Sequence, residues 1–262
     1  MNETNRIREG LTAGEQLIGV RATTHDPILI EVYGQLGFDY VWLDFEHGGA
    51  AVHDSQHIEM LSRTCESAGI EPLVRVPSAD PAQIRKVLDA GIHTVLVPRV
   101  ESEETARAAI AASRFHYDGE PGQRGHAGSR ANGYGARMEG YAARADDRTF
   151  VGIQIESITA VERLDALLAV PALGFAMIGH GDLAVSMGRP MAADDPEVQE
   201  TIARVHGTCR EMGVPVGRAV STTEAAEAAL EEGYDIVRVG DEVSSVRQVL
   251  VPRLDALRAD GD

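Results

Sequence analysis

Short apolar stretches alternate with longer amphipathic ones along most of the chain. The apolar stretches predict strands at residues 17–22, 39–43, 72–76, 93–97, 150–155, 175–178, 214–220 and 235–239. The amphipathic stretches predict helices at 27–36, 55–68, 82–90, 103–113, 136–144, 159–170, 196–212, 223–232 and 243–258. Roughly eight strand–helix units of this kind are the number that closes a parallel barrel. We therefore expect an α/β fold, a (β/α)₈ TIM barrel.

Helix boundary signals support these positions. Asp26-Pro27 and Asp80-Pro81 each combine a capping carboxylate with a proline in the first helical turn. Gly37, Gly69 and Gly91 end the expected helices. The alternative architecture, an open doubly wound sheet, favours a glycine-rich phosphate loop after the first strand, and the sequence has none there.

Residues 115–134 interrupt the alternation. They contain several glycines together with Arg124 and Arg130. We expect a long loop on the fourth strand-to-helix connection. A loop of this length in a compact domain is typical of a functional lid or binding segment.

Length and composition narrow the class of protein. The 262 residues, 44% of them hydrophobic and 5% aromatic, suit one barrel domain over 1–262 with an aliphatic core. The formal net charge of −17 repels phosphates and anionic lipids, so we expect neither a nucleic-acid nor a membrane partner. Lys86 is the only lysine. A GC-rich genome explains the arginine preference but not the acidity, which favours a halophilic host.

The remaining signals indicate a cytoplasmic protein. Cys65 and Cys209 lack metal-type spacing and suit buried thiols in a reducing compartment. The first residues, 1–5, have neither the basic nor the apolar part of a signal peptide. No apolar run approaches the length of a membrane span.

Polar residues follow several expected strands, and in a parallel barrel all strand C-termini open onto one face. Glu156 and Asp182 follow neighbouring strands, so they are candidates for a shared divalent cation. Taken singly, each carboxylate could be a helix cap or an ion-pair partner and not a metal ligand. Together on one rim, they favour the metal site.

Two further rim residues carry candidate chemistry. Arg75 is a candidate to bind a carboxylate or an enolate oxygen of the substrate. The alternative is a salt bridge to Asp44 or Glu46. His47 is a candidate general acid or base, and Asp89 is a candidate carboxylate to orient it. The alternative is a loop histidine that forms a hydrogen bond with the backbone.

Other motifs are weaker or exclude chemistry. The turn at 179–182 offers N–H groups to an anion, or is an ordinary strand-to-helix turn. His53 and His57 lack the glutamate of a zinc-protease motif and suit the surface. Lys86 lies in mid-helix, so Schiff-base catalysis is not expected and carbonyl chemistry would use a metal.

These residues occur in an order that resembles the HpcH/HpaI aldolases, metal-dependent class II pyruvate aldolases. The resemblance covers most of the chain and implies a TIM barrel of the phosphoenolpyruvate- or pyruvate-binding type. It depends on WLDFEHG at 42–48, VRVP at 74–77, LDAG at 88–91, VPRV at 97–100, PGQRG at 121–125, QIE at 154–156 and GDL at 181–183.

The resemblance implies a mechanism and an assembly. Glu156 and Asp182 would hold Mg²⁺ or Mn²⁺, with Co²⁺ or Zn²⁺ also possible, and pyruvate would chelate the ion beside Gln154. Backbone N–H groups near Gly181 and Asp182 would hold the pyruvate carboxylate. The family often exchanges its last helix between subunits, so we expect a homotrimer or homohexamer.

The remaining roles concern the carbon–carbon bond. Arg75 would stabilise the enolate oxygen, and His47, oriented by Asp89, would move the proton of the aldol hydroxyl. Arg124 would contact the aldehyde. The expected reaction is reversible cleavage of a 4-hydroxy-2-oxo acid or a 2-oxo-3-deoxy sugar acid to pyruvate and an aldehyde.

One residue departs from the family pattern. Where the metal loop usually carries proline, this chain has His180. Two other functions stay open: a citrate-lyase-like or malyl-CoA-lyase-like carbon–carbon lyase, and a non-catalytic oxo-acid-binding barrel. The first needs a basic surface for coenzyme A, which this acidic chain does not show.

Overall fold

A computed structural model describes residues 4–259 of the chain. Parallel strands in this part close into a barrel in the order β1-β10-β9-β8-β7-β4-β3-β2. They are β1 (Leu17–Ala22), β2 (Tyr40–Asp44), β3 (Glu71–Arg75), β4 (Thr94–Val97), β7 (Phe150–Ile155), β8 (Leu173–Ile178), β9 (Val216–Val220) and β10 (Ile236–Asp241). The expected (β/α)₈ barrel is confirmed.

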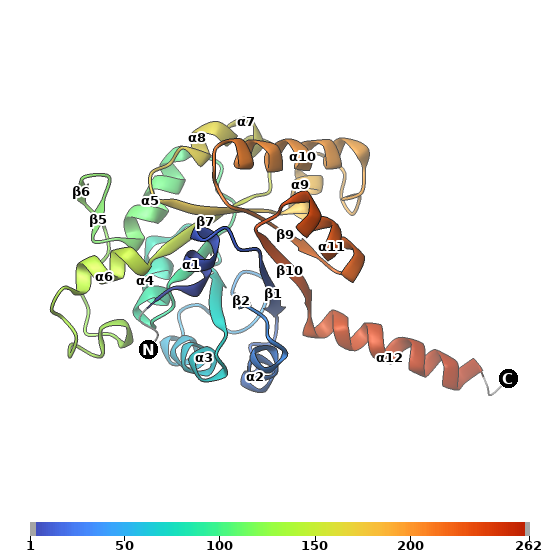
Figure 1. Cartoon of the computed structure of the whole chain (residues 1–262), viewed down its shortest axis with the longest axis horizontal. Coiled ribbons are helices and arrows are strands. Elements are labelled where there is room, and N and C mark those ends of the chain that lie inside the picture. Colours follow the sequence, from blue (N-terminus) through green and yellow to red (C-terminus); the bar gives the residue numbers. More distant parts are fainter. Residues whose placement is uncertain (1–3, 260–262) are drawn as a thin grey trace.

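Helices surround this barrel (Figure 1). They are α1 (Arg6–Thr12), α2 (Pro27–Leu36), α3 (Ser55–Ala68), α4 (Pro81–Asp89), α5 (Glu103–Ser113), α6 (Tyr141–Arg148), α7 (Ile158–Glu162), α8 (Leu164–Leu168), α9 (His180–Ser186), α10 (Pro196–Glu211), α11 (Thr223–Glu232) and α12 (Glu242–Ala259). Asp26 and Asp80 cap α2 and α4 as expected, and Gly37 ends α2 in the left-handed conformation. No helix among residues 4–259 is both long and apolar enough to cross a membrane.

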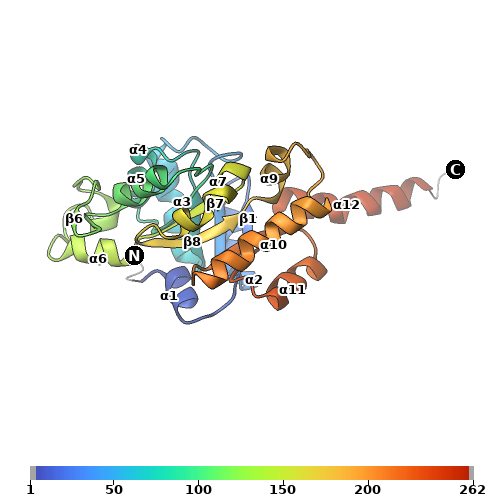
Figure 2. The ribbon, with the colours of Figure 1, turned by 90° about the horizontal axis from the view of Figure 1, so that it is seen from above.

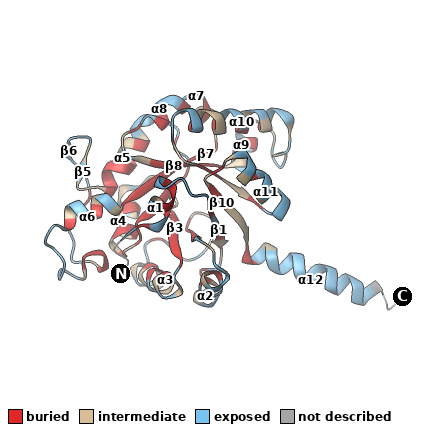
Figure 3. Cartoon of the chain, in the orientation of Figure 1, coloured by how far each residue is buried: buried red, intermediate tan, exposed pale blue. Residues whose placement is uncertain are grey.

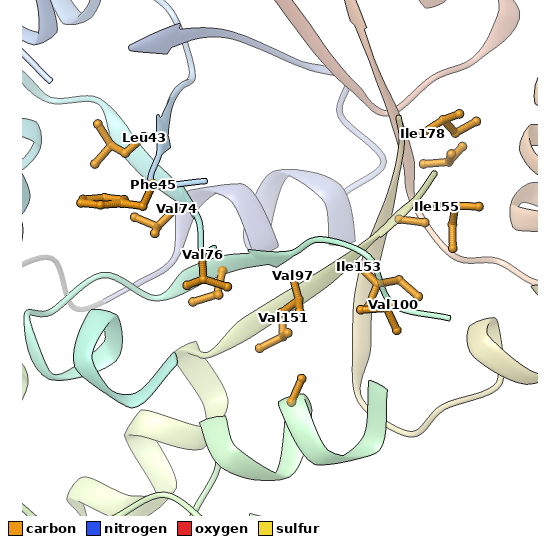
Figure 4. Close-up of a cluster of buried hydrophobic side chains, with 14 of the residues drawn as sticks. Leu43, Phe45, Val74, Val76, Val97, Val100, Val151, Ile153, Ile155 and Ile178 are labelled. Carbon is orange, nitrogen blue, oxygen red and sulfur yellow. The ribbon is translucent and has the colours of Figure 1, made fainter. Parts of the chain in front are cut away.

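Two apolar cores lie on the two faces of the strands. Residues pointing outward pack against the helices, and Figure 4 shows part of this layer, including Val74, Val97 and Ile153. Residues pointing inward fill the barrel: Leu17, Tyr40, Trp42, Leu73, Leu96, Phe150, Phe175, Met177 and Ile236, with Ile7 and Leu11 of α1. Strand residues alternate between the two faces because the side-chain period is two.

The inward aromatic rings need space that only glycine leaves. A Cβ at Gly19 would lie 2.4 Å from the ring of Tyr40, and a Cβ at Gly152 would lie 2.4 Å from the ring of Phe175. These glycines let large rings cross the barrel without strain in the backbone.

The long glycine-rich segment differs from its expected position. Helix α5 directly follows β4, so residues 114–140 join α5 to α6, ahead of β7, and lie at the N-terminal end of the strands. The prediction of a strand-to-helix loop was therefore wrong. The segment holds the β5 (His116–Tyr117) and β6 (Glu120–Pro121) hairpin and the 3₁₀ turn η1 (Arg130–Asn132), and helix resumes only at α6.

Helix α12 extends away from the barrel (Figures 1 and 2) and is exposed beyond its first turn (Figure 3). Its exposed apolar side chains include Val246, Leu250 and Leu254. Beside its first turn, a groove of about 580 Å³ lies on the barrel, lined by apolar side chains of α2 such as Leu29 and Tyr33. A protruding helix with exposed apolar side chains next to an apolar groove is the arrangement expected of an interaction surface.

Candidate active site

The C-terminal ends of the strands bring several predicted residues into one pocket. The pocket has a volume of about 290 Å³. Its lining residues are Glu46, His47, Arg99, Glu101, Glu156, Ser157, Asp182, Val185 and Ser186. The predicted metal ligands and His47 therefore share one cavity, as the strand-end pattern indicated.

Glu156 is the buried carboxylate of this pocket. Its Oε1 accepts a hydrogen bond of 2.6 Å from the backbone N–H of Arg99. Its Oε2 is buried and has no hydrogen-bond partner among residues 4–259. Burial, and then the negative charges of Glu46 and Asp182, raise the pKa of Glu156 to about 7. A cation between these carboxylates would relieve both effects.

Gly179 allows the chain to pass close to Glu156. A Cβ at this position would lie 2.7 Å from Glu156 Cβ, 2.8 Å from Glu156 Oε2 and 2.8 Å from Gln154 Nε2. Such distances are shorter than van der Waals contact. The glycine therefore brings the turn that carries Asp182 up against Gln154 and Glu156.

Arg75 is held by several acceptors beside the pocket. Its Nε and Nη2 donate to the two carboxylate oxygens of Asp44 at 2.9 and 2.6 Å. Its Nη1 lies 2.8 Å from Glu46 Oε2 and 3.4 Å from Gln154 Oε1. The salt bridges to Asp44 and Glu46 are thus present, and Nη1 still faces the strand that carries Glu156.

The Arg75 network also sets the charge of its carboxylates. Burial opposes ionisation of Asp44, but the hydrogen bonds and charge of Arg75 outweigh it and lower the pKa of Asp44. Burial is the main cause of the raised pKa of Glu46. Asp44 is therefore the ionised carboxylate that holds the guanidinium in place, while the pKa of Glu46 is higher than its usual value.

His47 faces the pocket from an exposed position. Its Nε2 lies 3.6 Å from Glu46 Oε2, and its backbone N–H lies 3.4 Å from Asp44 Oδ1. Asp89 ends α4 ahead of β4, at the opposite end of the barrel, where its carboxylate accepts from Ser129 at 3.4 Å. Within one chain Asp89 does not orient His47, and the adjacent carboxylate is Glu46 instead.

Arg124 also lies away from this pocket within the chain. It is buried, donates to the Tyr141 hydroxyl at 3.0 Å, and stacks over the rings of Phe115 and Tyr141. Its place follows from the loop that carries it, which lies at the N-terminal end of the strands.

His180 points into the protein at the start of α9. Its Nε2 is buried without a partner in the described part of the chain. Burial, and then the positive charges of Arg218 and Arg238, lower the pKa of His180 to about 4. The ring is therefore neutral near pH 7. Gly181 and Asp182 follow it in the first turn of α9, where helical N–H groups lack partners in the helix.

The donor set fits a divalent cation that keeps open coordination positions. Residues 4–259 contain no group of three or more His, Cys, Asp or Glu side chains arranged to hold a metal. Glu156 has an unpartnered buried oxygen, and Asp182 lines the same pocket. Two carboxylates with the rest of the shell left to water and substrate are typical of Mg²⁺ sites.

Comparison with known proteins identifies the family. The family model described as HpcH/HpaI aldolase/citrate lyase matches residues 18–249. The chain belongs to this family. The match confirms the predicted aldolase, a carbon–carbon lyase.

Named relatives match over nearly their whole length. A 2-keto-3-deoxy-L-rhamnonate aldolase of Klebsiella pneumoniae is 33% identical over 98% of this chain and 94% of its own. A 5-keto-4-deoxy-D-glucarate aldolase of Citrobacter koseri is 33% identical over 97% and 96%. A solved family member from Burkholderia cenocepacia J2315 superposes with a TM-score of 0.90 at 31% identity, covering 97% of this chain and 100% of that one.

Proposed function

We propose that this enzyme cleaves a 4-hydroxy-2-oxo acid, of the 2-oxo-3-deoxy sugar acid type, reversibly to pyruvate and an aldehyde with the help of a divalent metal. The observation that carries the proposal is the shared pocket of Glu156 and Asp182 beside the fixed guanidinium of Arg75. The named activities of the relatives from Klebsiella pneumoniae and Citrobacter koseri support the substrate class.

Glu156 and Asp182 would hold the metal, with Mg²⁺ or Mn²⁺ favoured and Co²⁺ or Zn²⁺ as alternatives. When bound, the cation would act as a Lewis acid on the 2-oxo group. The N–H groups of Gly181 and Asp182 and the side chain of Gln154 would position the pyruvate part of the substrate beside it. The raised pKa of Glu156 supports this assignment. Burial and the neighbouring carboxylates disfavour its ionised form, and a bound cation would stabilise that form.

Arg75 would stabilise the charge that develops when the C3–C4 bond breaks. The electron pair of that bond passes to the pyruvate fragment and leaves negative charge on the enolate oxygen. Asp44 holds Nε and Nη2, so the guanidinium is preorganised and Nη1 faces Gln154. Donors fixed where charge develops contribute strongly to catalysis because they need no reorganisation.

His47 would accept the proton of the C4 hydroxyl. Its imidazole lines the same pocket as Glu156, and histidine is a common general base in enzymes. Glu46, 3.6 Å from Nε2, would orient the ring and stabilise its protonated form. In the reverse direction the same proton returns to the new alkoxide.

We also propose a homotrimer or homohexamer, in which α12 packs on a neighbouring copy. The apolar groove on α2 and the exposed Val246, Leu250 and Leu254 support this. In such an assembly, Asp89 and Arg124 would act on the pocket of a neighbouring subunit, since neither reaches the pocket of its own chain.

The buried free thiols Cys65 and Cys209 support a reducing, cytoplasmic location, and the net charge of −17 supports a halophilic host. Strands from residues 17 to 241 contribute to one barrel, which supports a single domain over 1–262.

The experiment is pyruvate release from a panel of 4-hydroxy-2-oxo acids, before and after metal removal with EDTA. We expect activity to vanish on chelation and to return with Mg²⁺ or Mn²⁺. E156Q and D182N should lose both activity and metal binding, while E162Q, at an exposed glutamate of α7, should keep both. Full activity after thorough metal removal would contradict the proposal.

A citrate-lyase-type reaction is the second candidate. A solved citrate synthase superposes with a TM-score of 0.86 at 25% identity, over 99% of this chain. Cleavage of citrate or malyl-CoA without cleavage of any 4-hydroxy-2-oxo acid would favour it. Pyruvate binding by calorimetry without any turnover would favour a non-catalytic barrel.

A further inference from the structure

We propose that Arg238 and Arg21 form an anion subsite in the barrel mouth that binds an acidic group at the aldehyde end of the substrate. The inference rests on the proposed aldolase function and specifies its substrate class. It assigns the enzyme to oxo acids that carry a second oxyanion, a carboxylate or a sulfonate, beyond the bond that is cleaved.

Both arginines lie at inward positions of adjacent strands. Strands β1 and β10 pair with Gly19 opposite Arg238 and Arg21 opposite Asp241. Ile236 belongs to the core inside the barrel, so Arg238, two residues further on, has the same orientation one layer nearer the C-terminal mouth. Leu17 places Arg21 in the same way.

Arg238 pairs with no carboxylate in the described part of the chain. Its Nη1 donates to the backbone oxygen of Gly240 at 3.1 Å, and its Nε is buried without a partner. Among residues 4–259 it forms no ion pair. Burial, and then the charge of Arg21, lower the pKa of Arg238. An arginine does not lose its proton in a protein, so Arg238 stays charged. The free-energy cost of burying this unpaired charge remains until an anion binds.

Arg21 pairs with two carboxylates but keeps one donor free. Its Nη2 donates to Asp241 at 3.2 Å, and its Nη1 lies 3.7 Å from Asp44 Oδ2, the oxygen that also accepts from Arg75. Its Nε is buried and unpartnered. One carboxylate oxygen of Asp44 is therefore shared by two guanidinium groups, and neither Asp44 nor Asp241 forms an ion pair with Arg238 in the described chain.

Two polar atoms on this side of the barrel also have no partners. They are the hydroxyl of Tyr40 and the Nε2 of His180, both buried and unpartnered in the described chain. The charge of Arg238 acts on Tyr40, and it acts on His180 after the larger effect of Arg218. Unmet hydrogen-bonding groups around an unpaired cation are what a bound oxyanion would satisfy.

The subsite borders the reaction pocket through Arg75. The charge of Arg75 acts on Arg238 from one side, and Arg75 Nη1 faces Gln154 and Glu46 on the other. A substrate whose 2-oxo acid end lies near Glu156 would extend past Arg75 toward Arg238. Arg238 would then be a specificity-determining residue, separate from the group that moves the proton.

The test compares two aldehydes in the addition reaction with pyruvate: succinic semialdehyde, which carries a carboxylate, and butanal, which does not. The variants are R238M, R238K and, as a matched control, R218M. Arg218 lies on the neighbouring strand β9, where it pairs with Glu232 at 3.4 Å and stacks over Tyr234.

We expect R238M to lower kcat/KM for succinic semialdehyde about 10- to 100-fold, the usual range for a lost hydrogen bond between charged groups. Its kcat/KM for butanal should stay within about threefold, and R238K should restore part of the preference. R218M should leave the ratio of the two aldehydes unchanged. Equal losses for both aldehydes in R238M would overturn the subsite.

A binding measurement separates the subsite from the aldolase proposal. Succinate should raise the melting temperature of the wild-type chain and not that of R238M, while butanol should raise neither. This result with no turnover of any aldehyde would reject the aldolase proposal and retain the anion subsite. Equal stabilisation of both proteins by succinate would reject the subsite whatever the activity.

Discussion

Gly179 provides the sharpest test of how the pocket is built, through the substitution G179A. The added methyl group would lie 2.7 Å from Glu156 Cβ and 2.8 Å from Gln154 Nε2. Neither neighbour is at the end of a flexible exposed chain, because both are buried on β7 or directly after it. The methyl must therefore displace the proposed metal ligand, the turn before Asp182, or both.

The size of the effect follows from this geometry. Contacts must lengthen by roughly 1 Å to reach ordinary packing distances, and overpacking of this kind costs about 1–3 kcal/mol of stability. A shift of about 1 Å in a positioned group costs about 100-fold in rate. The backbone at Gly179 has φ −91°, so strain at the residue itself adds nothing.

The assay is pyruvate release coupled to lactate dehydrogenase, together with urea unfolding. We expect G179A to lose about 100-fold in kcat/KM and to need more Mn²⁺ for half-maximal activity. The control is G207A in α10, where an added Cβ meets nothing within 4 Å. It should keep full activity. Wild-type activity and metal affinity in G179A would refute the close packing of Gly179 against Glu156.

Four further outcomes are expected. D44N should lower kcat by 10-fold or more and cost about 3–5 kcal/mol of stability, because it breaks the buried pair with Arg75. His93 is buried with its pKa lowered to about 3, so it stays neutral in the fold while the unfolded chain takes up a proton. The free energy of unfolding should therefore decrease below pH 6.5, by about 2 kcal/mol at pH 5. The substitution H93F should abolish this part of the pH dependence. L250E combined with L254E should reduce the assembly to monomers in light scattering. The melting temperature should rise with KCl, since the net charge is −17.

Each of these outcomes has a defined contradiction. D44N with unchanged kcat would show that Arg75 does not need its carboxylate. An equal pH response in H93F and in the exposed control H126Q would remove His93 as the cause. An unchanged mass in the α12 double variant would exclude that helix from the interface. A melting temperature independent of KCl would argue against a surface adapted to salt.

The strand-end pattern was enough to predict the barrel and most of its rim. Glu156, Asp182, Arg75 and His47 follow apolar strands, and parallel closure brings strand ends together whatever their separation in the chain. Side-chain partners were harder to predict. Glu46 was expected only as a partner of Arg75, yet it is also the carboxylate beside His47.

The sequence did not predict where a residue lies on the barrel when the geometry of a connection decides its position, and the expected position of the long loop was wrong for this reason. Asp89 lies at the N-terminal end of the barrel because it ends α4, just ahead of β4. Arg124 lies at the same end because α5 comes before the glycine-rich segment. Hydrophobic periodicity marks a loop but not the pole of the barrel to which it belongs.

Arg238 was missed, although a signal was present. It stands two residues after Ile236 in an apolar strand, at the period that places both on the inner face. A charge at an inward position of such a strand indicates the barrel mouth. Its lack of an ion pair became visible only from the packing of β1 against β10.

The most direct test of the central claim is anomalous scattering from crystals soaked with Mn²⁺ and pyruvate. A single strong peak coordinated by Glu156 and Asp182, with pyruvate bound to it and Arg75 Nη1 directed at the 2-oxo oxygen, is the predicted result. A manganese ion bound elsewhere, or pyruvate bound without contact to either carboxylate, would contradict it.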